Sequence, residues 1–131
     1  MPYLQLDVNG TFPAERKRAL AQRIADDYAT LMTVDARRIS VTIRECGEGS
    51  VLRWVDGEMV PASVLMLDIR RGRPAALRME VAQKLIANCV EILGLRPDRV
   101  NVEFTQHDGD EMYHPTLGGY SPDWRADEVG G

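Results

Sequence analysis

The sequence has little of what a metal cage or a disulfide framework needs. Its 131 residues include only two cysteines, Cys46 and Cys89, and two histidines, His107 and His114, and no two cysteines have the CxxC spacing. So few thiols and imidazoles exclude a zinc cage of the usual kind, and we expect neither a metal nor another cofactor. Two thiols in a chain of this size suit a reducing compartment, where cysteines pack as small apolar side chains.

Export and membrane signals are also missing from the sequence. The start, Met1-Pro2-Tyr3, is not a basic segment followed by an apolar run, and no apolar stretch approaches the roughly 20 residues of a membrane span. With 16 Lys+Arg against 20 Asp+Glu, the net charge of −4 disfavours nucleic acid and anionic membranes as partners. Hydrophobic residues at 44% and charged residues at 27% are ordinary for one globular domain. We therefore expect a cytoplasmic protein that binds neither nucleic acid nor membrane.

The chain contains an internal repeat. Residues Leu6-Asp7-Val8 recur as Leu67-Asp68-Ile69, a shift of 61. The other matches at this shift are Pro13-Ala14 with Pro74-Ala75, Ala21-Gln22 with Ala82-Gln83, Arg38 with Arg99, and Val41 with Val102. All of these matches occur at the same shift of 61 residues without a gap, which indicates a duplicated unit of about 60 residues.

Each unit has the pattern of a strand, a helix and a second strand. Residues 3–8 and 64–69 are rich in β-forming side chains, and a turn and a proline follow each, Pro13 or Pro74, as is typical of a first helical turn. Apolar side chains then recur at the helical period, and Gly94 fits a left-handed C-terminal cap. The two apolar stripes are Leu20, Ile24, Tyr28 and Leu31, then Leu77, Val81, Leu85, Cys89 and Ile92. The closing strands are residues 39–43 and 100–104.

These elements predict an α/β fold, a tandem β-α-β repeat that gives a four-stranded sheet with two helices on one face. Both helices share a face because parallel strands joined through a helix cross over right-handed. Residues 1–131 form a single domain of two repeats, about 2–45 and 63–106, with a connecting loop or hairpin at 46–62 and a C-terminal loop or tail at 107–131. Since residues 64–69 have almost no polar face, we expect an oligomer that covers the other side of the sheet.

Pro2 is the first candidate for chemistry. Once Met1 is removed, Pro2 becomes a free secondary amine. An α-amino group has a pKa near 8, which burial or nearby cations lower. The neutral amine then serves as a general base and its conjugate as a general acid. The alternative is that Pro2 only permits removal of Met1.

The second candidate is a cluster of arginines that follows residues 64–69. Arg70, Arg71 and Arg73 stand between a strand and a helix start, where guanidinium forks and helix N–H groups bind a carboxylate. A solvated basic turn is the alternative. The first unit has Asn9 and Phe12 at equivalent places, so the two halves have diverged here.

Polar residues on the closing strands are further candidates. Ser40 and Asn101 are equivalent under the repeat, and their side chains are candidates for orienting a substrate by hydrogen bonds. Glu103 lies inside an apolar strand, where a buried carboxylate needs an ion-pair partner or acts as a catalytic acid. Arg37 and Arg38 come before the first closing strand, and we expect them to be structural partners of the acidic surface.

Two residues outside these strands remain. His114 either titrates near neutrality in a site or is an exposed loop histidine without a role. Trp54, in the segment between the repeats, is a candidate pocket wall.

Taken together, these residues resemble the tautomerase superfamily. The likeness rests on Met1-Pro2 at the start, two β-α-β units of about 60 residues and an arginine cluster after the third strand, and it covers roughly residues 2–119. The chain looks most like a fused form of 4-oxalocrotonate tautomerase, in which two short subunits have become one chain. This resemblance implies that Pro2 is the acid/base group, that no cofactor is used and that the assembly is a homotrimer.

The resemblance also extends to the fused cis-3-chloroacrylic acid dehalogenase. Gly72-Arg73 matches the glycine and arginine that follow a strand in 4-oxalocrotonate tautomerase, while Ser40 and Asn101 stand where its closing-strand arginine belongs. The dehalogenase has two arginines spaced three apart, as Arg70 and Arg73 are here. Its helix histidine, strand tyrosine and water-activating glutamate correspond to Tyr28, to a place near Glu103 and to a place near His114. The chain thus combines features of both groups.

The expected function is therefore that of an isomerase. Pro2 would ketonise an enol or dienol carboxylic acid such as 2-hydroxymuconate while the arginine cluster binds the carboxylate. The first alternative is water addition to a 3-haloacrylate, with Glu103 or His114 activating the water. The second is a ferredoxin-like module that binds small anions without catalysis and needs no free amine.

Overall fold

Two helices and two sheets make up the described part of the chain. The structure is a computed structural model that describes residues 2–117. The strands are β1 (Tyr3–Val8), β2 (Ser40–Glu45), β3 (Leu52–Val55), β4 (Glu58–Pro61), β5 (Ser63–Arg70) and β6 (Val100–His107). The helices are α1 (Ala14–Met32) and α2 (Ala75–Leu93), with short 3₁₀ turns η1 (Ala36–Arg38), η2 (Pro97–Arg99) and η3 (Gly109–Glu111).

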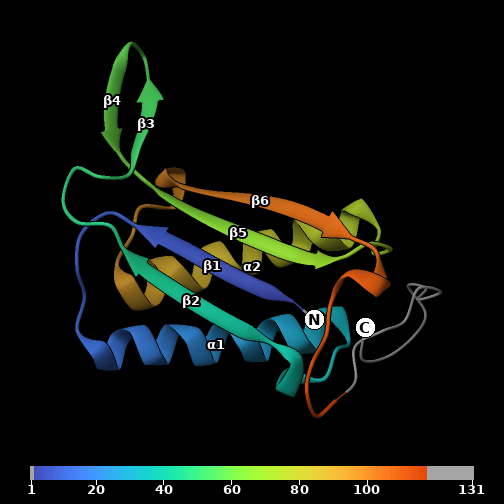
Figure 1. The fold of residues 1–131 in the computed structure, drawn as a ribbon. Coiled ribbons are helices and arrows are strands. Elements are labelled where there is room, and N and C mark those ends of the chain that lie inside the picture. The colour runs from blue at the N-terminus through green and yellow to red at the C-terminus, as the bar shows by residue number, and fades with distance from the viewer. Residues whose placement is uncertain (1, 118–131) are drawn as a thin grey trace.

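The main sheet has the order β2-β1-β5-β6, and both helices cover one of its faces (Figure 1). The pairs β1–β2 and β5–β6 are parallel, whereas β1 and β5 are antiparallel at the centre. This confirms the predicted four-stranded α/β arrangement. Each parallel pair is joined through a helix, and right-handed crossovers place both helices on the same face of the sheet.

The repeat appears as an approximate two-fold axis between β1 and β5. Leu4 pairs with Leu67 and Leu6 pairs with Leu65, so a shift of 61 exchanges one pair for the other. On the helix layer, the Asn88 side chain donates a 2.8 Å hydrogen bond to Asp27, its equivalent in the first unit. A symmetric core between two similar halves is therefore the basis of the fold.

The core lies between the sheet and the helices, and it follows the predicted stripes. Leu20, Ile24 and Tyr28 of α1 are buried, and Met32 rather than Leu31 completes that stripe. Gly94 ends α2 in the left-handed conformation, with φ 71°, where a residue with a Cβ would be strained. Neither helix of residues 2–117 has the length and hydropathy needed to cross a bilayer.

The opposite face of the sheet is open in the single chain, and it is more polar than β5 alone predicts. β5 contributes Val64 and Met66 to this face. Its neighbours contribute Tyr3, whose hydroxyl donates to Thr42 at 3.0 Å, and Thr105, whose hydroxyl donates to Asp68 at 2.9 Å. Local strand hydropathy therefore overstated how apolar the face is.

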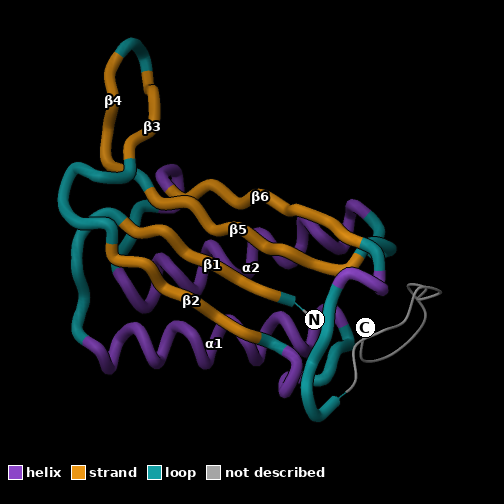
Figure 2. Tube along the Cα trace, in the orientation of Figure 1, coloured by secondary structure: helices purple, strands orange, loops and turns teal. Residues whose placement is uncertain are grey.

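The segment between the repeats is a hairpin of β3 and β4 that projects from one end of the sheet (Figure 2). Three apolar side chains on it are exposed, Leu52, Trp54 and Met59. At the other end of the chain, β6 runs on to His107, further than predicted, and η3 follows. Of the tail expected at residues 107–131, the part from residue 118 onward lies outside the described residues.

Candidate active site

Pro2 lies at the edge of the sheet where β1 and β2 begin. It is buried, and its carbonyl accepts a 3.2 Å hydrogen bond from the backbone N–H of Ser40. A hollow of about 510 Å³ opens at this edge, a size typical of small-molecule sites. It is lined by Pro2, Tyr3, Arg37, Arg38, Ser40 and residues 112–115. The structure therefore brings Pro2 and Ser40, two of the sequence candidates, to one hollow.

Two arginines of η1 belong to the same hollow. Asp35 caps η1 and accepts hydrogen bonds from both Nε and Nη2 of Arg37, the latter at 2.6 Å. These hydrogen bonds to Arg37 lower the pKa of the Asp35 carboxyl to about 2. Arg38 donates from Nη2 to the carbonyl of Leu117 at 2.8 Å. Arg37 thus has the structural partner that we expected, but both arginines also place positive charge beside Pro2.

Sequence reasoning missed this role of Arg37 and Arg38, although a signal was present. Both residues come directly before β2, and parallel strands start at the same edge of a sheet. Side chains that precede β2 must therefore lie near those that precede β1, where Pro2 stands.

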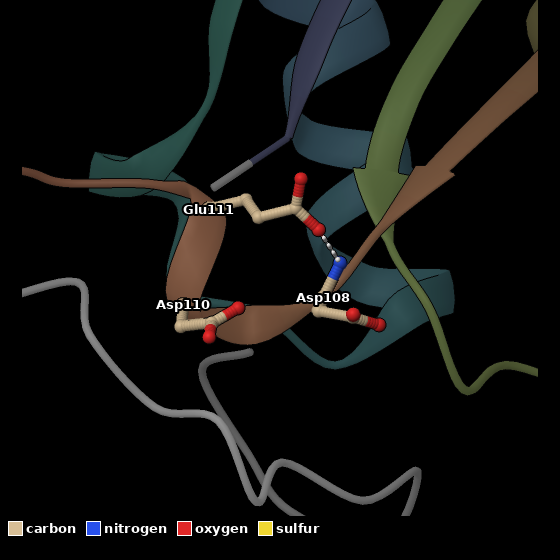
Figure 3. Close-up of side chains that lie close together, drawn as sticks. All are labelled: Asp108, Asp110 and Glu111. Atoms are coloured by element: carbon tan, nitrogen blue, oxygen red, sulfur yellow. Dashed lines mark hydrogen bonds between the residues drawn. The ribbon is translucent and has the colours of Figure 1, made fainter.

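The outer wall of the hollow is set by the turn η3, which a capping box stabilises (Figure 3). The Glu111 carboxylate accepts a 2.9 Å hydrogen bond from the backbone N–H of Asp108. Asp108 also pairs with Arg71 at 3.1 Å, and the exposed Asp110 lies close by. Capping accounts for the approach of Asp108 and Glu111, and residues 112–115 follow the turn and line the hollow of Pro2.

His114 is part of this wall. Its Nδ1 accepts hydrogen bonds from the backbone N–H groups of Thr116 and Leu117, both at 3.1 Å. Nδ1 is therefore the unprotonated nitrogen of the neutral ring, and the proton is on Nε2. The half-buried ring lines the hollow of Pro2, so of the two alternatives for His114 the location fits the one with a site.

The three predicted carboxylate-binding arginines have separate surroundings. Arg70 is buried, and continuing the β1–β5 register by one residue sets Pro2 opposite Ile69, beside Arg70. Arg71 is exposed and pairs with Asp108. Arg73 is buried and donates from Nη2 to the carbonyl of Met32, at the C-terminus of α1, at 3.2 Å. Only Arg70 of this cluster therefore lies next to Pro2 along the sheet.

Tyr28 is in the core rather than at the hollow. It is 1% exposed on the inner side of α1, and burial raises the pKa of its phenol well above the ordinary value. The positive charge of Arg73 opposes that rise, so the two side chains are close. Burial in turn lowers the pKa of the Arg73 guanidinium.

The remaining candidates lie elsewhere in the chain. Asn101 pairs with Val64, at the sheet end opposite Pro2. Glu103 pairs with Met66 and is exposed on the open face, which corrects the expectation that its carboxylate is buried. Trp54 is on the projecting hairpin, remote from Pro2 in the same chain (Figure 1).

Comparison of the fold with solved structures gives a consistent result. Pt0534, solved after inactivation by 2-oxo-3-pentynoate, aligns with a TM-score of 0.77 at 19% identity over 90% of this chain and 96% of that chain. N1, a member of the cis-3-chloroacrylic acid dehalogenase family, aligns with a TM-score of 0.79 at 18% identity over 92% of this chain and 85% of that chain. The fused 4-OT called Q0, a symmetric trimer, aligns with a TM-score of 0.79 at 17% identity over 94% of this chain and 99% of that chain.

The chain therefore has the fold that these neighbours share, among them a fused 4-OT and a member of the cis-3-chloroacrylic acid dehalogenase family. Nearly the whole chain takes part in the likeness, which confirms the resemblance in fold that the sequence indicated. In sequence, no protein-family model and no curated protein matches the chain.

Proposed function

We propose that the chain is a tautomerase of enol or dienol carboxylic acids, with Pro2 as the general base and acid. The observation that carries the proposal is the hollow that Pro2 shares with Arg37, Arg38, Ser40 and His114. After removal of Met1, the guanidinium groups of Arg37 and Arg38 would favour the neutral form of the Pro2 amine, because neighbouring positive charges disfavour its protonated form. The neutral amine is the form that a general base requires.

The proposed reaction moves one proton. After removal of Met1, the Pro2 nitrogen takes the proton from the hydroxyl of a dienol acid such as 2-hydroxymuconate. The O–H electron pair forms the ketone C=O bond, the double bond shifts, and the carbon at its end takes a proton from the Pro2 ammonium. No oxidant, metal or organic cofactor is required for this balance.

The substrate carboxylate would be held by the arginines of the hollow. A guanidinium has five N–H donors, and Arg37 uses Nε and Nη2 for Asp35 while its side chain stays largely exposed. Arg38 and Arg70 add positive charge at the same edge, which stabilises the negative charge that develops on the enol oxygen. Arg37 and Arg38 thus take over much of the role first expected of the cluster at residues 70–73.

Water addition to a 3-haloacrylate is a second candidate, and one observation favours it. His114 lines the hollow with Nδ1 accepting backbone hydrogen bonds, so Nε2–H is left for a water or a substrate. Such an N–H would position a water but not deprotonate it. N1, from a dehalogenase family, shares the fold.

We further propose that the chain works as a homotrimer. The projecting hairpin exposes apolar Leu52, Trp54 and Met59, and a neighbouring copy would bury them. Q0, of the same fold, is a trimer. In such an assembly Trp54 would wall the hollow of another copy instead of its own.

The deciding experiment blocks the amine. Mass spectrometry of the purified chain first establishes whether Met1 is removed. A variant with lysine inserted between Met1 and Pro2 keeps the methionine, because a large second residue prevents its removal, and it buries the proline nitrogen in a peptide bond. We expect kcat/KM for ketonisation of 2-hydroxymuconate to fall by about 10²–10⁴.

The matched control is Pro2→Ala, which keeps a free amine and should retain part of the activity. Halide release from 3-chloroacrylate is measured on the same samples and separates the two enzymatic candidates. If the blocked chain folds and turns over 2-hydroxymuconate at the wild-type rate, Pro2 is not the base. Binding of carboxylates without turnover in any variant would indicate the non-catalytic module.

A further inference from the structure

A second hollow lies at the opposite end of the sheet from Pro2. Its volume is about 200 Å³. It is lined by Asn9, Pro61, Ala62, Ser63, Gly94, Leu95, Arg96 and Arg99. These residues come from the end of β4, the start of β5, the position after β1, and the segment from the end of α2 to η2. A strand start and a 3₁₀ turn thus contribute to this hollow, as β1 and η1 do to the hollow of Pro2.

The internal repeat explains why two hollows exist. A shift of 61 converts Pro2 into Ser63 and Arg38 into Arg99. The same shift relates Asn9, which lines the second hollow, to Arg70, which lies beside Pro2. The two hollows are therefore counterparts under the approximate two-fold axis, and they differ in a few side chains.

The second hollow has an excess of positive charge. The Asp98 carboxylate is held by Nε and Nη2 of Arg96 at 3.0 and 2.8 Å. Arg53 donates from Nη1 to the Asp98 carbonyl at 2.7 Å. Within residues 2–117, the ion pair of Arg99 with Asp98 is its only one, and it is long at 4.0 Å. One carboxylate is thus shared by the guanidinium groups of Arg96 and Arg99, and Arg99 is the one it neutralises less.

A buried hydroxyl adds a neutral donor. Ser63 lines the hollow and is 3% exposed, yet its hydroxyl forms no hydrogen bond with any group in residues 2–117. The hydroxyl oxygen is not sealed from solvent, so water in the hollow reaches it, and a polar ligand there would take the place of that water. Pro61, Ala62 and Leu95 supply apolar walls for a short carbon chain.

We propose that this second hollow binds a small carboxylate, with Arg99 as the cation and the Ser63 hydroxyl as a further donor. At roughly 30 Å³ for each water-sized group, the volume holds about six or seven heavy atoms, the size of a carboxylic acid with about three carbons. The site binds without transforming its ligand, because Ser63 lies within the chain and has no free amine. The inference is independent of whether Pro2 is a base.

The test counts bound carboxylate by equilibrium dialysis of the full chain against ¹⁴C-malonate at low ionic strength. We expect about two malonates per wild-type chain, one at each end of the sheet. Arg99→Gln removes the charge, and Ser63→Val fills the second hollow; each should leave about one malonate per chain. Arg38→Gln is the matched change at the counterpart residue, and it should affect the Pro2 hollow alone.

Circular dichroism and thermal melting verify that each variant is folded. The double variant R38Q/R99Q should bind at least tenfold more weakly at both hollows. Two results would overturn the proposal. In the first, the wild-type chain binds one malonate and Arg99→Gln does not change that number. In the second, R99Q and S63V both still bind two malonates per chain.

A further result would support this site and count against the Pro2 hollow. In that case the wild-type chain binds one malonate, R99Q abolishes the binding, and R38Q leaves it intact.

Discussion

Replacing Arg73 by methionine tests whether this arginine stabilises the fold or binds substrate. Arg73 is 5% exposed, and its Nη2 donates to the Met32 carbonyl at the C-terminus of α1, 3.2 Å away. A hydrogen bond that involves a charged group contributes about 1.5–3 kcal/mol, and a cation at a helix C-terminus adds about 0.3–1 kcal/mol. Methionine fills similar space and removes the desolvation cost of a buried charge. We expect the free energy of unfolding to fall by about 1–3 kcal/mol.

Urea denaturation followed by circular dichroism measures this loss. The midpoint should fall while the slope with urea stays constant, because the surface exposed on unfolding is the same. In thermal melting, Tm should fall by about 5–10 °C. The control is Arg71→Met, whose ion pair with Asp108 is exposed and contributes about 0–1 kcal/mol.

Kinetics completes the test of Arg73. For the proposed ketonisation of 2-hydroxymuconate, R73M should keep kcat/KM within a few-fold of wild type at a temperature well below its Tm, because the guanidinium donates to the end of α1. An R73M chain as stable as wild type but inactive would refute the reasoning and return Arg73 to the substrate site.

Two other predictions concern acid stability and assembly. The folded pKa of Asp35, about 2, lies below the ordinary 3.8 because of its hydrogen bonds with Arg37, so the carboxylate stabilises the fold above pH 4 and loses this effect as the pH falls toward 2. In Asp35→Asn, the free energy of unfolding should therefore depend less on pH between 4 and 2. Urea titrations at several acid pH values measure this dependence, and the same dependence in variant and wild type would contradict the prediction. Trp54→Ser should weaken the proposed trimer, seen as a smaller sedimentation coefficient at low protein concentration. Tyr113→Ser, at an even more exposed aromatic outside the hairpin, should leave the coefficient unchanged.

The local pattern of the sequence was enough for the elements and their connection. Strand, helix and strand in each half follow from side-chain periodicity, and the shift of 61 relates the halves without any three-dimensional information. Gly94 as the helix cap is likewise a local property, since only the backbone conformation at that residue matters. Because parallel strands joined through a helix cross over right-handed, both helices must then lie on the same face of the sheet.

Which side chains meet at the hollow was decided by the tertiary structure. Three arginines within four residues looked like one receptor, but the chain turns between β5 and α2, so Arg70 lies by β1, Arg71 faces solvent and Arg73 points to the end of α1. Arg38, distant from Pro2 in sequence, lines its hollow because parallel β1 and β2 start at the same edge. Sequence spacing determines the period of burial along one element, whereas contact between elements depends on the register and direction in which the strands pair.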